Sequence, residues 1–139
     1  MAQLTGSVTP WPEDMMKQYK WLDACLQKQP ATEVVFQPAW QAYKYMLSGK
    51  MYALIGINDQ NGRPMLTLKL DPLHSDLLRQ QYQDIVPGYY MNKVNWSTVY
   101  LDGAVPQDVI EGMVSASHHV VLSSLPKKMQ REILESYVT

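Results

Sequence analysis

Four short segments between residues 32 and 70 follow one another with only brief interruptions, and each is rich in β-branched and aromatic residues. Such runs are typical of β-strands. The connections over 48–50 and 58–64 are short and contain the Gly, Asn and Asp residues that tight turns need. Strands joined by short turns run in opposite directions, so the region predicts an antiparallel sheet. The four segments are 32–36, 42–47, 51–57 and 65–70.

The last of these segments shows which face of its strand is apolar. Leu66, Leu68 and Leu70 alternate with other residue types, Lys69 among them. Successive side chains of a strand point to opposite faces of the sheet. The three leucines are therefore expected to face the core, with Lys69 on the opposite face.

Helical periodicity is present on both sides of the strand region. Apolar residues recur at spacings of three and four after Pro12, from Asp71 to about residue 83, after Pro106 and after Pro126. Between the second and third of these helices we expect a turn over 86–88 and a strand over 94–101. The four apolar stripes are Met15, Tyr19, Leu22 and Leu26; Leu73, Leu77, Leu78 and Tyr82; Ile110, Met113, Val114, Ser117 and Val121; and Met129, Ile133, Leu134 and Tyr137.

The order of the elements defines the fold class. Strands and helices do not alternate strictly, and no internal repeat is present. The sequence predicts an α+β fold in which an antiparallel sheet of about five strands packs helices on one face and leaves the other face in water. With 139 residues, of which 46% are apolar, the chain fits one domain over 1–139 that begins with a loose segment over 1–10.

Charge and cysteine content restrict the class of protein. The 12 Lys and Arg residues against 13 Asp and Glu give a net charge of -1, so any nucleic-acid surface must be local. Cys25 is the single cysteine, which fits a reducing compartment and a small buried side chain. The N-terminal sequence has no basic start followed by an apolar run, and no window reaches the roughly 18 apolar residues of a membrane span. A cytoplasmic protein without membrane contact is expected.

Motifs for catalysis, cofactors and metals are absent from the sequence. There is no GxSxG, GxGxxG or GxxxxGK[ST] motif, so we expect no enzymatic activity, no catalytic residue and no cofactor. His118 and His119 are adjacent on a predicted helix and point about 100° apart, which prevents them from sharing a metal. The segment 59–62 resembles part of a calcium loop but lacks its acidic twelfth position, so a hairpin turn is expected instead. No metal site is predicted.

Aromatic and basic residues are interleaved in the strand region. The chain has nine Tyr and four Trp but one Phe, which favours aromatic side chains with a polar tip. Two interpretations explain these aromatic side chains. They form cross-strand pairs on a solvated sheet, or they form a surface that binds a partner. Between residues 40 and 70 there are four basic residues and one acidic residue. These basic side chains could bind phosphates. Lysines on sheet edges also discourage aggregation, which is the alternative explanation. The residues concerned are Tyr43, Tyr45, Tyr52 and Tyr100, and Lys44, Lys50, Arg63 and Lys69.

Several motifs resemble the MmcQ/YjbR family in order and spacing over residues 49–125. The most specific is PGYYMNKVNWSTVYLDG at 87–103, and the others are GKMYAL at 49–54, LTLKLDP at 66–72, LLR at 77–79 and SAS at 115–117. The resemblance implies a CyaY-like α+β fold and DNA binding through a double wing of β-hairpins, and it implies no enzymatic activity. CyaY-like folds also suggest iron binding, but the first helix has no acidic ridge, so iron is not carried over.

The resemblance assigns candidate DNA contacts to particular positions. Two alternatives stay open at this point: Trp96 also fits a core anchor, and Arg79 also fits an ion pair with Asp76 or Asp84. Lys69 is the hardest position to explain by packing. The family-pattern positions are Lys50, Lys69, Arg79, Lys93, Trp96, Ser97 and Thr98, and Lys44 and Arg63 on the same strands and turns complete the candidate DNA-binding set.

Two functions follow as expectations. The first is a small bacterial DNA-binding protein, with a regulatory role, that contacts the duplex backbone through a basic double-wing surface. The segment 34–101, which carries a charge of +2, is where that surface is expected. The second is a protein-interaction or chaperone-like module whose Tyr-rich exposed sheet face binds a partner protein or forms a homodimer.

Overall fold

The computed structural model describes residues 17–88 and 92–138 of the chain. The predicted loose segment 1–10 and the predicted start of the first helix after Pro12 lie outside these residues. The elements in chain order are α3 (Lys20–Gln27), β1 (Thr32–Gln37), the short 3-10 helix η1 (Pro38–Trp40), β2 (Ala42–Leu47), β3 (Lys50–Ile57), β4 (Pro64–Lys69), α4 (Pro72–Gln81), β5 (Ile85–Pro87), β6 (Trp96–Tyr100), α5 (Gln107–Ser123) and α6 (Lys127–Val138).

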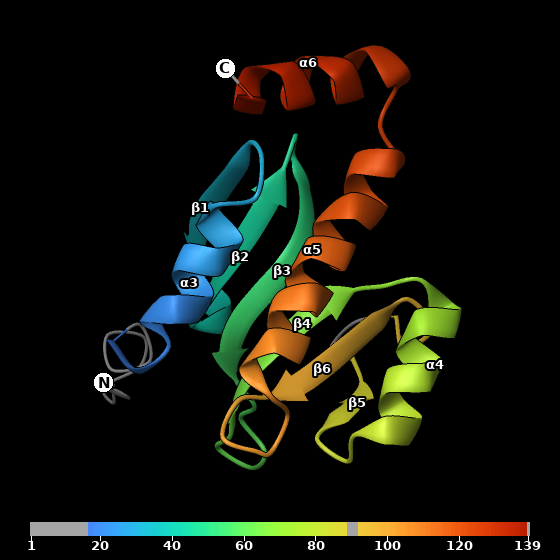
Figure 1. Cartoon of the computed structure of the whole chain (residues 1–139). Coiled ribbons are helices and arrows are strands. Elements are labelled where there is room, and N and C mark those ends of the chain that lie inside the picture. The colour runs from blue at the N-terminus through green and yellow to red at the C-terminus, as the bar shows by residue number, and fades with distance from the viewer. Residues whose placement is uncertain (1–16, 89–91, 139) are drawn as a thin grey trace.

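The strands form one antiparallel sheet in the order β1-β2-β3-β4-β6-β5. Helices α3 and α5 lie against one face of the sheet, α4 sits beside β5 and β6, and α6 lies across one end of the sheet (Figure 1). The α+β class and the antiparallel sheet are confirmed. The sheet has six strands rather than about five, because residues 85–87 pair with β6 where a turn was predicted. Three residues are too few to show a period of two in the sequence.

The core lies between the sheet and helices α3 and α5. Leu66 and Leu68 of β4 are fully buried, and so are Leu22 and Leu26 of α3. Because the leucines of β4 face the helices, alternation puts Lys69 on the other face, opposite Trp96 of β6. The predicted phase of this strand is confirmed.

A β-bulge interrupts the register between β2 and β3. Tyr45 pairs with Ala53 but Met46 pairs with Met51, which leaves Tyr52 as the extra residue of β3. Tyr52 packs among the core residues between the sheet and the helices, and its hydroxyl donates to the carbonyl oxygen of Leu26 at 3.0 Å. Burial raises the pKa of Tyr52 to about 12.

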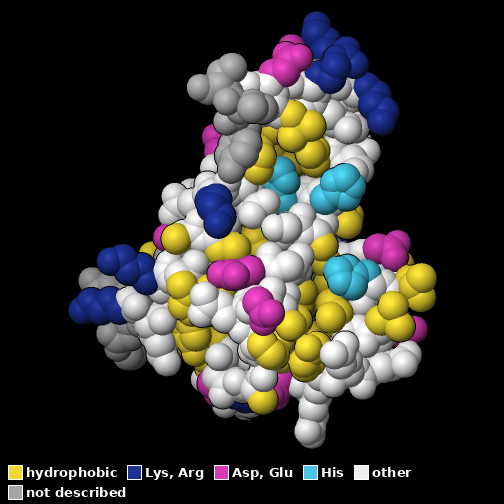
Figure 2. Space-filling view, viewed as in Figure 1, with side chains coloured by type: hydrophobic (Ala, Val, Ile, Leu, Met, Phe, Trp, Pro, Cys, Tyr) yellow, Lys and Arg dark blue, Asp and Glu magenta, His cyan; other side chains and the backbone are white. Residues whose placement is uncertain are grey.

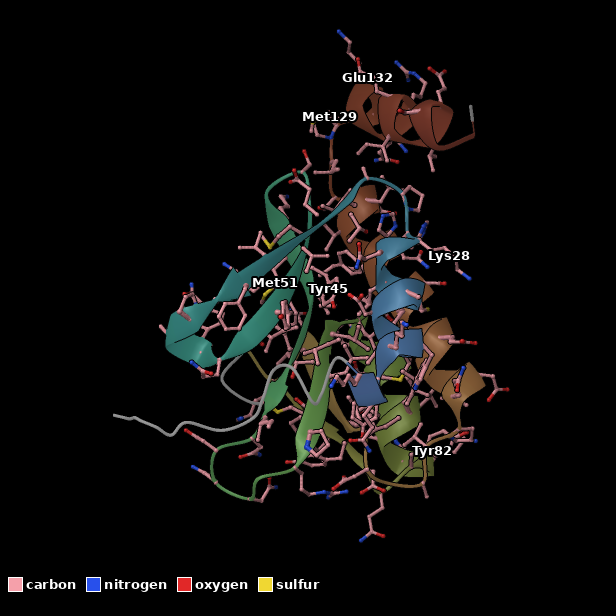
Figure 3. All side chains as sticks on the ribbon, turned by 90° about the vertical axis from the view of Figure 1, so that its left-hand side faces the viewer. Lys28, Tyr45, Met51, Tyr82, Met129 and Glu132 are labelled. Carbon is pink, nitrogen blue, oxygen red and sulfur yellow. The ribbon has the colours of Figure 1, made fainter. Side chains whose placement is uncertain are left out.

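The burial of two tyrosines corrects the predicted Tyr-rich exposed face. Tyr45 and Tyr52 are both 0% exposed. The Tyr45 hydroxyl donates to Asp23 of α3 at 2.7 Å, and its ring lies between the sheet and α3 (Figure 3). The opposite face of the sheet is only partly open to water, since Leu54 and Met65 on it are at most 2% exposed whereas Val35 is 44% exposed.

Two helices bury a narrower stripe than their sequences predict. In α4, Leu73 and Leu77 are 68% and 57% exposed, and Leu78 is the leucine that packs against the core. The reason is the position of α4 at the edge of the sheet beside β5, where only one side of the helix packs against the rest of the protein. In α6, Met129 and Ile133 are half-buried, but Leu134 remains exposed.

His118 of α5 is buried against the turn between α3 and β1. Its Nε2 lies 2.7 Å from the carbonyl oxygen of Pro30, and its ring meets the Tyr52 ring edge to face. Burial lowers the pKa of His118, and the adjacent His119 adds to the effect, while the Pro30 carbonyl opposes it.

This burial predicts a pH dependence of stability. A histidine whose pKa is lower in the folded state stabilises the fold fully above its unfolded pKa, near 6.5, and loses that contribution as the pH falls below it. Urea unfolding should therefore give a lower free energy of unfolding at pH 5.5 than at pH 7.5. His118→Gln should reduce this difference, and an unchanged difference in the variant would contradict the assignment.

Within the described residues, no helix is both long and apolar enough to cross a bilayer. Cys25 is buried and free, as predicted. No cluster of three or more His, Cys, Asp and Glu side chains suited to a metal ion occurs in 17–88 or 92–138.

Candidate nucleic-acid interface

Ser97 and Thr98 are buried, so their predicted role in DNA contact is wrong. Both residues are 0% exposed. The Thr98 hydroxyl lies 2.8 Å from that of Thr67 on the neighbouring strand, and Ser97 faces α4. A side chain without exposed surface cannot reach a duplex. Thr98 connects β6 to β4, and Ser97 connects β6 to α4.

Arg79 is occupied by the fold itself. Its guanidinium donates to the Ser97 hydroxyl at 2.9 and 3.1 Å and to the carbonyl oxygens of Lys93 and Trp96, each at 2.9 Å. It pairs with neither Asp76 nor Asp84, the two partners that the sequence left open. Arg79 therefore fastens α4 to the start of β6, and its donors face protein groups rather than a phosphate.

Arg63 in the β3–β4 turn is held by two carboxylates. Its Nε donates to Asp102 at 2.9 Å and its Nη2 to Asp84 at 3.2 Å, while its guanidinium carbon lies 4.2 Å from the centre of the Tyr100 ring. The backbone N–H of Ala104 also donates to Asp84, and this bond together with Arg63 lowers the pKa of that carboxyl. The surroundings of Arg63 carry no surplus of positive charge, so it contributes little to a phosphate surface.

Three of the remaining candidates gather at one corner of the sheet. Lys69 of β4 is directly opposite Trp96 of β6, and alternation places both on the face away from α3 and α5. The Lys93 ammonium donates to the carbonyl oxygen of Gly88 at 3.2 Å, and the Gly88 N–H donates to the Trp96 carbonyl at 2.7 Å. Lys93 thus lies beside Trp96 as well. We call Lys69, Trp96 and Lys93 the Trp96 corner.

Lys44 and Lys50 take different positions relative to the Trp96 corner. Lys44 of β2 is on the same face of the sheet as Lys69, two strands away, with its ammonium 5.7 Å from the centre of the Trp40 ring. Lys50 follows the β2–β3 turn at the end of the molecule, and its ammonium donates to the Ser124 hydroxyl at 3.3 Å. The predicted set therefore converges in part: Lys44 shares a face of the sheet with the corner, whereas Lys50 belongs to a different surface.

Acidic residues are nearly absent from the sheet. Among the residues of the six described strands, Glu33 on the edge strand β1 is the single acid, while Lys44, Lys50 and Lys69 are basic. Positive charge on the face of the Trp96 corner is thus balanced by no carboxylate of β2, β3, β4, β5 or β6.

A second basic group lies outside the candidate DNA-binding set. Lys127, Lys128 and Arg131 are exposed on the first turns of α6, where Figure 2 shows Lys and Arg side chains gathered at the α6 end. The bond from Lys50 to Ser124 brings a fourth cation toward this end. The spacing of the three residues on one helix was the available signal, but their proximity to the β2–β3 turn is set by the tertiary fold.

The structure defines a small α+β protein in which an antiparallel sheet packs two helices on one face and has a basic, tryptophan-containing corner on the other. The sequence model of the YjbR family matches residues 26–120, and the chain belongs to this family. It is 32% identical over 114 residues to YjbR of Escherichia coli K12, which is described as uncharacterized, and the match covers 82% of this chain and 94% of that protein. It is also 29% identical over 91 residues to YyaQ of Bacillus subtilis, which covers 60% of this chain and 76% of YyaQ.

Solved structures show the same fold. The DR2400 protein of Deinococcus radiodurans, with a DUF419 domain, superimposes with a TM-score of 0.73 at 31% identity and covers 83% of this chain and 86% of its own. A protein of Pseudomonas syringae gives a TM-score of 0.60 at 26% identity, with 74% of this chain and 97% of that chain covered. The resemblance predicted from the motifs over 49–125 is therefore confirmed.

Proposed function

We propose that this protein binds DNA by contacting the sugar-phosphate backbone with the Trp96 corner and Lys44. The observation that carries the proposal is the register of β4 and β6, which sets Lys69 directly opposite Trp96 on a face without carboxylates from the central strands. A lysine ammonium is a compact charge that suits phosphate oxygens. An aromatic face beside it can stack on a base or pack against a sugar.

The proposed contact lies at the sheet corner rather than at the hairpin tips that a double wing implies. The β3–β4 turn contributes Arg63, which Asp84 and Asp102 neutralise. The β2–β3 turn contributes Lys50, which lies beside Ser124 at the α6 end of the molecule, away from the Trp96 corner. Lys44 and Lys69 are on strands and Lys93 is on the loop before β6, so the proposed contact is made by the partly exposed side chains of the Trp96 corner and of Lys44 rather than by hairpin tips.

Salt dependence tests the proposal. Three lysine contacts should give a slope of log K against log salt of about −3 on a duplex, because each neutralised phosphate contributes about −0.9. Anisotropy of a fluorescein-labelled mixed-sequence duplex, titrated between 25 and 200 mM salt, measures this slope. Lys69→Ala with Lys93→Ala should weaken binding and reduce the slope by about two units.

The matched control changes the same charge elsewhere. Lys127→Ala with Lys128→Ala removes two exposed lysines from α6, far along the chain from the corner, and should leave the slope unchanged. Absence of binding by the unmodified chain at 25 mM salt would refute the proposal. An equal loss in both double variants would show that total charge, and not the Trp96 corner, determines the affinity.

A further inference from the structure

The two edges of the sheet differ in how they are protected. The β5 edge is three residues long, contains Pro87 and lies beside α4. Short edge strands, prolines and covering helices all prevent an edge from pairing with another chain. The β1 edge has six residues, no proline and one charge, Glu33, and no described strand pairs with its outer side. This edge has the features of a strand that accepts a partner.

The free backbone groups of β1 can be located from the ladder. Thr32 donates its N–H to the Gln29 carbonyl at 3.3 Å and not to β2. In an antiparallel ladder, residues that bond to the neighbouring strand alternate with residues whose groups point outward. With Thr32 pointing outward, Val34 and Phe36 also present their N–H and C=O groups to the open edge.

We propose that β1 pairs antiparallel with β1 of a second copy of this chain, with Val35 of each copy on the two-fold axis. In this register Val34 is opposite the partner's Phe36, so both residues that present free groups are used. Each such pair forms two backbone hydrogen bonds, and the symmetry gives four in total. Two six-stranded sheets then become one continuous sheet.

Side chains favour a second copy in this register over an unrelated strand. Val35 and Phe36 are 44% and 38% exposed in the single chain, and pairing covers both with apolar side chains. Glu33 meets the partner's Gln37, whose amide can donate to the carboxylate, so no like charges face each other. A register shifted to place Val34 on the axis would oppose Phe36 to Thr32, whose N–H is already bonded.

A cleft at the end of β1 lies where the second copy would approach. It has a volume of about 450 Å³ and is bounded by residues 31–33 and by Met129 and Ile133 of α6. Figure 3 looks onto this side, with β1 along the near edge of the sheet and α6 across its upper end. Because the partner strand runs antiparallel, its η1 turn, with the 51% exposed Trp40, arrives beside residues 30–32. The mouth of the cleft thus offers apolar surface to that turn.

Charge substitutions at the axis test the pairing without DNA. Sedimentation equilibrium should show a mass that rises with concentration from the 15.9 kDa of one chain toward twice that value. Val35→Lys and Val35→Glu each place two like charges face to face and should weaken self-association about tenfold or more. An equimolar mixture of the two variants sets opposite charges on the axis and should restore association.

Controls separate the edge from other surfaces. Leu73→Lys adds a charge at an exposed leucine of α4 and should leave association unchanged. Urea unfolding of each variant checks that Val35, which is exposed, tolerates the change. A constant mass of one chain up to millimolar concentration would overturn the proposal. Self-association that survives Val35→Lys, or a mixture that fails to associate, would overturn the register.

Discussion

Gly88→Ala is expected to lower the free energy of unfolding by about 3 kcal/mol. A Cβ atom at this position would lie 2.6 Å from Cβ of Trp96, 2.8 Å from its carbonyl oxygen and 2.9 Å from its carbonyl carbon. Two of these three atoms belong to the backbone of β6, so no side-chain rotation relieves the contact. The β5–β6 pairing and the bond from the Gly88 N–H to the Trp96 carbonyl would have to open.

Gly112→Ala provides the matched control with the opposite sign. Gly112 is in the middle of α5, and nothing lies within 4 Å of a Cβ added there. Alanine favours a helix interior over glycine, so this variant should be more stable by about 0.5–1 kcal/mol. Urea unfolding monitored by circular dichroism measures both. A Gly88→Ala variant as stable as the unmodified chain would show that β5 and β6 are farther apart than the structure places them.

The sheet and most helices could be predicted because local patterns determine them. Leu66, Leu68 and Leu70 set the phase of β4, and Asp71 before Pro72 marks the start of α4, where its carboxylate accepts the N–H groups of Leu73 and His74. These signals depend on neighbours a few residues away. They are therefore visible in a single sequence.

The bulge at Tyr52 could not be predicted, and it accounts for the burial of this tyrosine. One extra residue in β3 shifts the side chains that follow it relative to β2. Strict alternation through Tyr52 and Ala53 would have put one of them on the face away from α3 and α5, whereas both belong to the core. No residue in the segment 50–57 marks the irregularity, and the bond from the Ser117 hydroxyl to the Tyr52 carbonyl joins residues 65 positions apart.

The candidate site was only partly predictable for a related reason. Lys69 could be assigned to the open face from alternation alone. Whether a cation is free depends on partners distant in sequence, such as Asp84 and Asp102, which are 21 and 39 residues from Arg63. The same holds for Arg79, whose partners are the Ser97 hydroxyl and two main-chain carbonyls that no sequence pattern reveals.

Ser117→Ala is expected to lower the free energy of unfolding by about 2–3 kcal/mol, because two main-chain groups lose their hydrogen-bond partner. The Ser117 hydroxyl is fully buried, donates to the Tyr52 carbonyl at 2.6 Å and accepts from the Lys69 N–H at 3.1 Å. The β3–β4 ladder ends at the pair of Ala53 and Leu68, one residue short of these groups. The hydroxyl bridges the gap that the bulge opens, and alanine would leave a buried donor and a buried acceptor unpaired.

Ser115→Ala separates this effect from any change in helix propensity. Ser115 is exposed on the same helix, in the same SAS motif, and its replacement should change stability by no more than about 0.5 kcal/mol. Hydrogen exchange adds a local readout, since the Lys69 amide should lose protection in Ser117→Ala but not in Ser115→Ala. Equal free energies of unfolding for the two variants would contradict the role of the Ser117 hydroxyl in joining β3 and β4.

The same substitution links the fold to the proposed function. Lys69 is the last residue of β4, and its N–H is fixed to α5 by Ser117 while its side chain belongs to the Trp96 corner. If the end of β4 loosens, Lys69 is no longer held opposite Trp96. Ser117→Ala should therefore weaken duplex binding at a temperature where the variant is still folded, although Ser117 itself is buried. Binding that is unchanged in folded Ser117→Ala would show that the corner does not depend on this anchor.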